Sequence, residues 1–247
     1  MPETIVLLHG FAGTGRMWEP VITGLDGAPY LPLAPDLRGH GSASGRRPID
    51  FAACAADVLA LVDGPFALCG YSLGGRVALH VALAAPDRVT RLVLVATTAG
   101  IEDPDERAAR RRADDTLAEE IAAGTIDDFV ARWSAQPLFA GDPPAAVAAW
   151  EADQRRNDPA GLAAALRGIG TGAMVPLWDR LGTLTMPADV LAGERDAKFR
   201  TLGERLAAAL PHAALTVVPG AGHGLPREAP DAVAAAIRRR DPASSAR

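Results

Sequence analysis

A serine between two glycines is the clearest candidate for chemistry in this sequence. Residues 70–74 read Gly-Tyr-Ser-Leu-Gly, and they lie between an apolar run at 66–69 and a segment typical of a helix at 73–84. A sharp turn from a strand into a helix exposes a serine hydroxyl at its tip, and small residues two positions away on each side relieve crowding. The context therefore predicts that Ser72 is a reactive serine.

A histidine and a carboxylate would have to lie beside this serine, because its hydroxyl alone is a weak nucleophile and a weak base at neutral pH. Asp196 and His223 each follow an apolar run of strand length. The chain order of serine, acid and histidine is one of the orders known for such triads. We predict a triad of Ser72, Asp196 and His223, with Glu194 as a rival acid whose place on the loop favours another direction.

The loop after the first apolar run could supply an oxyanion hole. His9, Gly10 and Phe11 are followed by a glycine-rich stretch, and we predict that the backbone N–H groups of Phe11 and Leu73 are the donors. Two such amides, fixed in advance toward a developing oxyanion, would each lower the barrier by ~3–4 kcal/mol. We expect His9 and His40 to brace the loops rather than to take part in the chemistry.

Short apolar runs alternate with helix-length segments along the chain. The runs lie at residues 4–8, 30–34, 66–69, 92–96, 188–192 and 215–218. Helices are predicted at residues 51–62, 73–84, 202–210 and 231–239. Buried strands that alternate with helices are typical of an α/β fold. We predict a doubly wound, mostly parallel sheet, with all three members of the triad at strand ends.

The alternation stops between residues 102 and 175. This stretch is rich in alanine and charged residues, favours helices, and is interrupted by glycine, by Gly-Asp-Pro-Pro and by Asn-Asp-Pro. We predict a cap of three or four short helices, inserted after the strand at 92–96. Residues 1–101 and 176–240 would form the core domain, and residues 241–247 would be a frayed tail.

Composition narrows the classes of function. A formal net charge of -5 argues against nucleic acid or an anionic membrane as a partner. Cys54 and Cys69 both lie in apolar segments, so we expect no disulfide framework. No secretory signal or membrane span is visible, which makes cytoplasmic residence the default expectation. No residues have the spacing of metal ligands, and the glycine-rich loop lacks the lysine of a phosphate site, so we predict no metal and no cofactor.

Several longer motifs point to a known family. They are residues 8–11 with Trp18, and residues 70–76, 136–139, 166–172 and 193–199. Across essentially its whole length the chain resembles the α/β-hydrolase superfamily. The motifs together resemble the 2-succinyl-6-hydroxy-2,4-cyclohexadiene-1-carboxylate (SHCHC) synthase family of menaquinone biosynthesis.

The resemblance implies a lyase. Members of this family remove pyruvate from 2-succinyl-5-enolpyruvyl-6-hydroxy-3-cyclohexene-1-carboxylate, without an acyl-enzyme and without attack by water. Ser72, activated by His223 and Asp196, would act as a general base on the ring proton next to the succinyl carbonyl. The Phe11 and Leu73 amides would hold the resulting oxyanion, and its collapse would expel pyruvate.

A small-molecule substrate with several carboxylates needs cations in its site, and the planar fork of arginine pairs well with carboxylates. Arg76 lies one helical turn after the serine, near the mouth of the site, although it could instead be a surface arginine paired with a cap carboxylate. The resemblance points to arginine runs in the cap, where Arg112 and Arg156 are the candidates, although such runs are often solvated. Tyr71 and Trp133 are expected as pocket walls, or as ordinary core.

Two departures from the family's pattern concern the rim of the pocket. The family usually has an asparagine and a second histidine after the catalytic histidine, whereas residues 224–227 here read Gly-Leu-Pro-Arg. Trp133 is followed by Ser134, where some members have an aromatic residue. Both departures bear on the fit of the substrate more than on the triad.

Two other functions could use the same residues. A carboxylesterase or lactonase would attack an ester with Ser72 and form an acyl-serine that water releases. A ligand receptor built on this fold would keep the triad and turn over slowly. The arginines near Ser72 favour a polyanionic substrate, because a lipophilic ester would leave those charges poorly compensated in a closed pocket.

Overall fold

Six strands form one sheet, in which every neighbouring pair runs parallel. The structure is a computed structural model that describes residues 2–139 and 141–239, so the tail expected at 241–247 lies outside the described residues. The strand order is β2-β1-β3-β4-β5-β6. The strands are β1 (Glu3–Leu8), β2 (Tyr30–Leu33), β3 (Phe66–Tyr71), β4 (Val89–Val95), β5 (Ala188–Gly193) and β6 (Ala213–Val218). This sheet confirms the predicted parallel α/β fold, and each strand overlaps one of the apolar runs.

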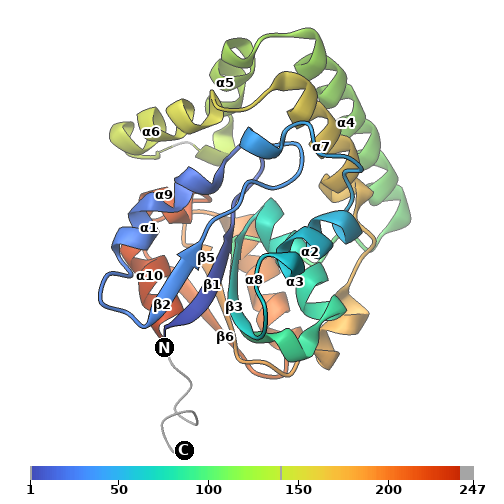
Figure 1. Cartoon of the computed structure of the whole chain (residues 1–247). Helices are drawn as coiled ribbons and strands as arrows, with labels where there is room; N and C mark the ends of the chain where they lie inside the picture. The colour runs from blue at the N-terminus through green and yellow to red at the C-terminus, as the bar shows by residue number, and fades with distance from the viewer. Residues whose placement is uncertain (1, 140, 240–247) are drawn as a thin grey trace, which may run out of the picture.

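Helices cover both faces of the sheet (Figure 1). One face packs against α2 (Phe51–Ala60), α3 (Leu73–Ala84) and α8 (Ala197–Ala209), and the other packs against α1 (Glu19–Thr23), α9 (Leu225–Glu228) and α10 (Pro230–Arg238). Short 3-10 helices are η1 (Gly15–Trp18), η2 (Gly41–Ala43), η3 (Pro86–Arg88), η4 (Pro137–Phe139), η5 (Thr171–Ala173) and η6 (Trp178–Thr183). Within the described residues, no helix is both long and apolar enough to cross a membrane.

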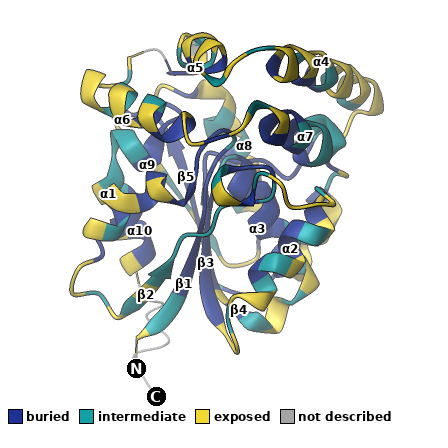
Figure 2. Cartoon of the chain, turned by 45° about the horizontal axis from the view of Figure 1, so that its top comes forward, coloured by how far each residue is buried: buried dark blue, intermediate teal, exposed yellow. Residues whose placement is uncertain are grey.

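Alternate residues of the strands face opposite layers. In β1, Val6 and Leu8 pack into the layer of α2 and α3, whereas Ile5 and Leu7 pack into the layer of α1 and α10. All four side chains are fully buried. Because both faces are covered, the central strands are mainly apolar, which is why apolar runs predicted them, although Arg91 of β4 and Asp189 of β5 form an ion pair there. Figure 2 shows this buried sheet between helices whose outer surfaces are exposed.

Four helices lie between β4 and β5, above the carboxyl ends of the strands (Figure 1). They are α4 (Pro104–Ala123), α5 (Ile126–Ser134), α6 (Pro144–Gln154) and α7 (Pro159–Ile169). Side chains fix where three of them begin: Asp103 caps α4, Thr125 and Asp128 form a capping box at α5, and Asp158 caps α7. Three of the helices are short, as expected, whereas α4 runs for 20 residues.

A separate apolar cluster joins these helices to the core. Ile121 of α4, Phe129 of α5 and Leu162 of α7 pack together with Ala12. Ala12 belongs to the loop that follows β1, so the inserted helices rest on the strand ends that were predicted to carry the chemistry. The domain boundaries at residues 102 and 175 stay a prediction.

Candidate active site

Ser72 lies at the tip of the turn between β3 and α3. Its backbone has φ 50° and ψ -108°, a conformation that L-residues rarely adopt. A side chain at Gly74 would collide with the carbonyl oxygens of Leu8 and His9, and a side chain at Gly70 would collide with the first turn of α3. The two glycines therefore let α3 begin directly against the end of β1, with the serine at the exposed tip.

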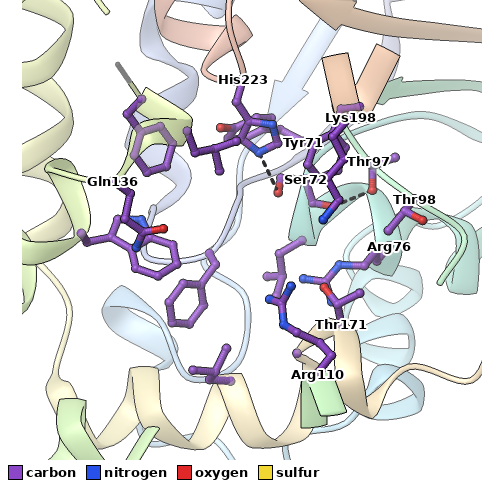
Figure 3. A pocket seen from close by; sticks show the side chains of 18 of the residues that line it. Tyr71, Ser72, Arg76, Thr97, Thr98, Arg110, Gln136, Thr171, Lys198 and His223 are labelled. Atoms are coloured by element: carbon purple, nitrogen blue, oxygen red, sulfur yellow. Dashed lines mark hydrogen bonds between the residues drawn. The ribbon is translucent and has the colours of Figure 1, made fainter. Parts of the chain in front are cut away.

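Three side chains form a continuous hydrogen-bonded row. His223 Nδ1 lies 2.7 Å from Asp196 Oδ2, and His223 Nε2 lies 3.3 Å from Ser72 Oγ (Figure 3). Asp196 and His223 are buried, whereas Ser72 is half-buried and lines a cavity. With Nδ1–H donating to the aspartate, Nε2 is left to accept the serine proton. The structure thus brings together the three residues predicted to form the triad.

Asp196 and Glu194 have different partners, although they are two residues apart. Asp196 Oδ1 also accepts the N–H of Phe199 at 3.2 Å and thereby caps α8. Glu194 is exposed, and its Oε2 accepts the N–H of Gly220 at 2.8 Å. Of the two carboxylates, Asp196 is the one that contacts the imidazole, so the geometry favours it over its rival.

Phe11 and Leu73, the expected oxyanion donors, both line the cavity with Ser72. Leu73 is the first residue of α3, and the first N–H groups of a helix have no acceptor inside the helix. Phe11 lies in a turn after β1, which a hydrogen bond from Gly13 N–H to the Gly10 carbonyl closes at 3.1 Å. Both residues border the cavity beside Ser72, and the role of their amides as oxyanion donors stays a prediction.

Two buried histidines brace the loops beneath the site. His9 Nδ1 lies 2.8 Å from the Gly10 carbonyl oxygen, and His9 Nε2 accepts the N–H of Leu37 at 2.9 Å. The His40 ring meets the His9 ring edge-on, with centroids 4.9 Å apart. Burial is the main cause that lowers the pKa of both rings, to about 3 for His40. Both histidines are therefore neutral parts of the scaffold.

A cavity of about 210 Å³ opens beside Ser72. Its walls come from the core and from the inserted helices. The lining residues are Phe11, Tyr71, Ser72, Leu73, Arg76, Thr97, Thr98, Arg110, Trp133, Gln136, Leu138, Phe139, Trp150, Leu166, Gly170, Thr171, Lys198, Phe199 and His223. Figure 3 shows Arg76, Arg110 and Thr171 together on one side of the serine, with Gln136 on the other.

Three positively charged side chains line this cavity. Arg76 is buried, and its Nη1 donates to the Ile169 carbonyl at 2.9 Å. Arg110 is half-buried, and its Nε donates to Asp114 Oδ1 at 2.7 Å. Lys198 is the only lysine of the chain. Burial is the main cause that lowers the pKa of Arg76, and the nearby Arg110 charge lowers it further, while the Asp114 carboxylate acts in the opposite direction. The cavity is therefore suited to an anionic ligand.

Arg112 and Arg156 lie outside this cavity, which corrects the expectation from the sequence. Arg112 is exposed on α4, because two residues along a helix turn a side chain by about 200° from the face that carries Arg110. Arg156 follows α6 and is exposed, and its Nε lies 3.8 Å from Asp153 Oδ1. Arg110, which the sequence placed only within a run of three arginines, occupies the position expected for Arg112.

Tyr71 and Trp133 both line the cavity, as expected for pocket walls. Burial raises the pKa of Tyr71 to about 12, so its phenol is protonated at neutral pH. The Trp133 ring lies 5.1 Å from the Phe11 ring and 5.5 Å from the Phe129 ring, measured between centroids. These aromatic contacts connect the inserted helices to the loop that would hold the oxyanion.

Some pocket residues were not singled out from the sequence. Gln136, Thr171 and Lys198 come from three distant segments, so their spacing carried no signal. The available signal was their place in motifs that carried the family resemblance, at 136–139, 166–172 and 193–199. In the part of the chain that the structure describes, no group of three or more His, Cys, Asp or Glu side chains is arranged to hold a metal ion.

Known proteins resemble this chain along nearly its whole length. The sequence pattern of the alpha/beta hydrolase family matches residues 5–236. The chain is 34% identical over 237 residues to the SHCHC synthase of Klebsiella pneumoniae, and the match covers 94% of this chain and 91% of that protein.

Solved structures agree with this assignment. The structure of MenH from S. aureus superposes with a TM-score of 0.91 at 30% identity, over 96% of this chain and 92% of that chain. A thermophilic esterase from Thermogutta terrifontis superposes with a TM-score of 0.80 at 28% identity, over 96% and 88%. The chain therefore belongs to the alpha/beta hydrolase family and, within it, to the family of SHCHC synthases.

Proposed function

We propose that this chain is a lyase that removes pyruvate from 2-succinyl-5-enolpyruvyl-6-hydroxy-3-cyclohexene-1-carboxylate and yields SHCHC, the compound for which its relatives are named. This would be a step of menaquinone biosynthesis, carried out in the cytoplasm. Sequence identity and fold similarity over nearly the whole chain support the proposal. The observation that carries it is the cavity: Ser72, at the end of the triad, opens onto a space lined by three cations.

The three cations match the charges of this substrate. Its ring, its succinyl group and its enolpyruvyl group each carry a carboxylate. Ionised hydrogen bonds to carboxylates are the strong ones, and arginine can make them in pairs. Arg76 Nη1 donates to the Ile169 carbonyl, which fixes the side chain. The Nε and Nη2 groups of Arg76 have no acceptor among the described residues. Arg76 is therefore held in place with donors to spare, and Arg110 and Lys198 supply further positive charge.

The reaction would begin at the ring proton next to the succinyl carbonyl. Ser72 Oγ takes this proton and passes its own to His223 Nε2, while Asp196 stabilises the imidazolium. The electrons of the C–H bond move onto the succinyl carbonyl as an enolate oxyanion. The N–H groups of Phe11 and Leu73 hold that oxyanion, and each such donor contributes about 10²–10³ to the rate.

Collapse of the oxyanion would complete the elimination. The ring gains its second double bond as the C–O bond to the enolpyruvyl group breaks. The departing enolate of pyruvate takes a proton from His223, so the triad returns to its starting state. No water is consumed and no covalent enzyme intermediate forms. The step therefore needs a base and an oxyanion site, and it needs no further reagent.

The helices between residues 102 and 175 would act as a cap over this reaction. Arg110 of α4 and Trp133 of α5 line the cavity from these helices, and the core supplies Ser72 and His223. A cap that excludes water strengthens the ionic contacts inside the site and protects the enolate from the solvent. The division into a core and a cap thus has a chemical purpose in this proposal.

An ester or lactone substrate is the alternative reading, since the triad would serve it equally well. The similarity to an esterase structure is in keeping with such an activity. A lipophilic ester, however, would have no use for Arg76, Arg110 and Lys198, and these cations would face an apolar ligand at a cost in free energy. The charge of the cavity therefore favours the polycarboxylate.

The test is pyruvate release from freshly generated substrate, with nitrophenyl acetate hydrolysis measured in parallel. Ser72→Ala is expected to lower kcat for pyruvate release by at least about 10³-fold, because the base is removed. Arg76→Ala is expected to raise KM about tenfold or more, the loss typical of a hydrogen bond to a charged group. Fast ester hydrolysis that needs Ser72, together with pyruvate release at only the spontaneous rate, would contradict the proposal and favour an esterase.

A further inference from the structure

The carboxylate of Glu228 lies directly beneath the loop that carries His223. Glu228 is the last residue of α9, and its side chain is only 3% exposed. Its Oε2 accepts the N–H of Gly222 at 2.8 Å, and its Oε1 accepts the N–H of Gly224 at 2.8 Å. One carboxylate therefore holds the backbone on both sides of the histidine.

The same carboxylate is connected to the loop that carries the catalytic acid. Arg195, the neighbour of Asp196, donates from Nη2 to Glu228 Oε2 at 2.6 Å and from Nε to the Gly220 carbonyl at 2.8 Å. The N–H of Arg195 also donates to the Ala221 carbonyl at 2.9 Å. The loops of the aspartate and of the histidine are thus joined through Glu228 as well as through the triad itself.

The histidine loop needs such a restraint because of its composition. Residues 220–224 read Gly-Ala-Gly-His-Gly, and glycine loses more conformational freedom on folding than any other residue. Gly220 has φ +66°, in the region that favours glycine. Charge-assisted hydrogen bonds to a carboxylate are about twice as strong as neutral ones, so Glu228 can hold a glycine-rich backbone that would otherwise adopt several conformations.

We propose that Glu228 is a positioning residue that sets the place of His223 between Asp196 and Ser72 through the amides of Gly222 and Gly224. The inference rests on the proposed function only in that His223 activates Ser72 by accepting its proton. His223 Nε2 is 3.3 Å from Ser72 Oγ, at the outer limit of the reach of a proton acceptor. A small shift of the loop therefore breaks the contact through which the serine is activated.

Two variants separate positioning from bulk and charge. In Glu228→Gln the side chain keeps its length, but an amide nitrogen replaces one of the two accepting oxygens. In Glu228→Ala both acceptors are lost. The matched control is Glu194→Gln, because Glu194 also accepts a backbone N–H of this loop, that of Gly220, three residues before His223.

Kinetics of pyruvate release are the first readout. Glu228→Gln is expected to lower kcat about tenfold and Glu228→Ala about 100-fold, the size of effect that a misplaced catalytic group produces. KM should stay within about threefold, because the proposed carboxylate-binding cations do not contact Glu228. Glu194→Gln should keep kcat within about twofold. An unchanged kcat in both Glu228 variants, or an equal loss in Glu194→Gln, would overturn the proposal.

Two further measurements need no substrate turnover. The first is the low-field proton resonance of His223 Nδ1–H, assigned by its loss in His223→Gln, which should shift or broaden in Glu228→Gln and stay in place in Glu194→Gln. The second is the rate at which an alkyl fluorophosphonate labels Ser72, which should fall with kcat. If the parent protein releases no pyruvate, the proposed function fails, whereas these two readouts still decide the role of Glu228. An unshifted resonance and unchanged labelling in Glu228→Gln would exclude the proposed role of Glu228. This outcome can be read even if Glu228→Ala does not fold.

Discussion

Arg227 donates from both Nε and Nη2 to one carboxylate oxygen of Asp142, at 2.9 and 2.7 Å. Both side chains are buried, and the guanidinium lies over the rings of Phe139 and Trp150, 4.8 Å from each centroid. Asp142 precedes α6, whereas Arg227 belongs to α9. The pair therefore fastens the inserted helices to the short helix that follows the catalytic histidine.

Replacement of Asp142 with asparagine should destabilise the protein strongly. The substitution leaves the buried Arg227 guanidinium without a counterion, and loss of one partner of a buried pair costs about 3–5 kcal/mol in free energy of unfolding. Urea denaturation measures this loss. The control is Asp127→Asn, since Asp127 pairs with Arg155 at 2.8 Å on the exposed surface, where an ion pair contributes little. Equal losses in the two variants would show that Arg227 and Asp142 are not an anchor.

Arg110 and Arg112 should differ in their effect on substrate binding, although they are two residues apart on one helix. Arg110 lines the cavity and Arg112 is exposed. Arg110→Ala is expected to raise KM for pyruvate release about tenfold, as for the loss of a charged hydrogen bond, while Arg112→Ala leaves KM within about twofold. If Arg112→Ala has the larger effect, the register of α4 over the cavity is not the one described.

The difference between these two arginines shows where sequence reasoning stops. The strands could be predicted because a sheet covered on both faces makes its strands mainly apolar. The triad could be predicted because each member lies in the turn or loop that follows a strand, and parallel strands end at one edge. Arg112 and Arg156 were misplaced because their direction depends on how α4 and α6 are rotated on the core. Lys198 was not predicted because only the folded chain brings it to the same cavity as Arg76 and Arg110.

Gly74→Ala should damage both stability and activity. Its new methyl group would meet the carbonyl oxygens of Leu8 and His9, which cannot move without shifting the end of β1. Overpacking of this kind typically costs about 1–3 kcal/mol, and the shift would displace Ser72. Thermal denaturation and kcat are the measurements. Gly45→Ala is the matched control, because a methyl group there meets nothing within 4 Å, and it should be nearly neutral. If Gly74→Ala changed neither the stability nor kcat, the close approach of α3 to the end of β1 would be contradicted.

His40 should make the protein sensitive to acid. Burial, and then the neighbouring His9 ring, lower the pKa of His40 from 6.5 to about 3 in the folded protein. Between these two values the unfolded chain binds a proton that the folded chain does not, so the free energy of unfolding falls as the pH falls. For one such group the slope approaches about 1.4 kcal/mol per pH unit below the unfolded pKa.

Urea denaturation at pH 7, 6, 5 and 4, in the parent and in His40→Gln, tests this expectation. Glutamine cannot take up the proton, so the variant should lose stability more slowly on acidification, by up to about 1.4 kcal/mol per pH unit. The substitution changes the absolute stability as well, which is why the slopes are compared and not the values at one pH. Carboxylates that titrate in this range contribute equally to both proteins, and the difference in slope therefore isolates His40. Parallel slopes would mean that His40 has an ordinary pKa in the folded state, and that its ring is not buried as described.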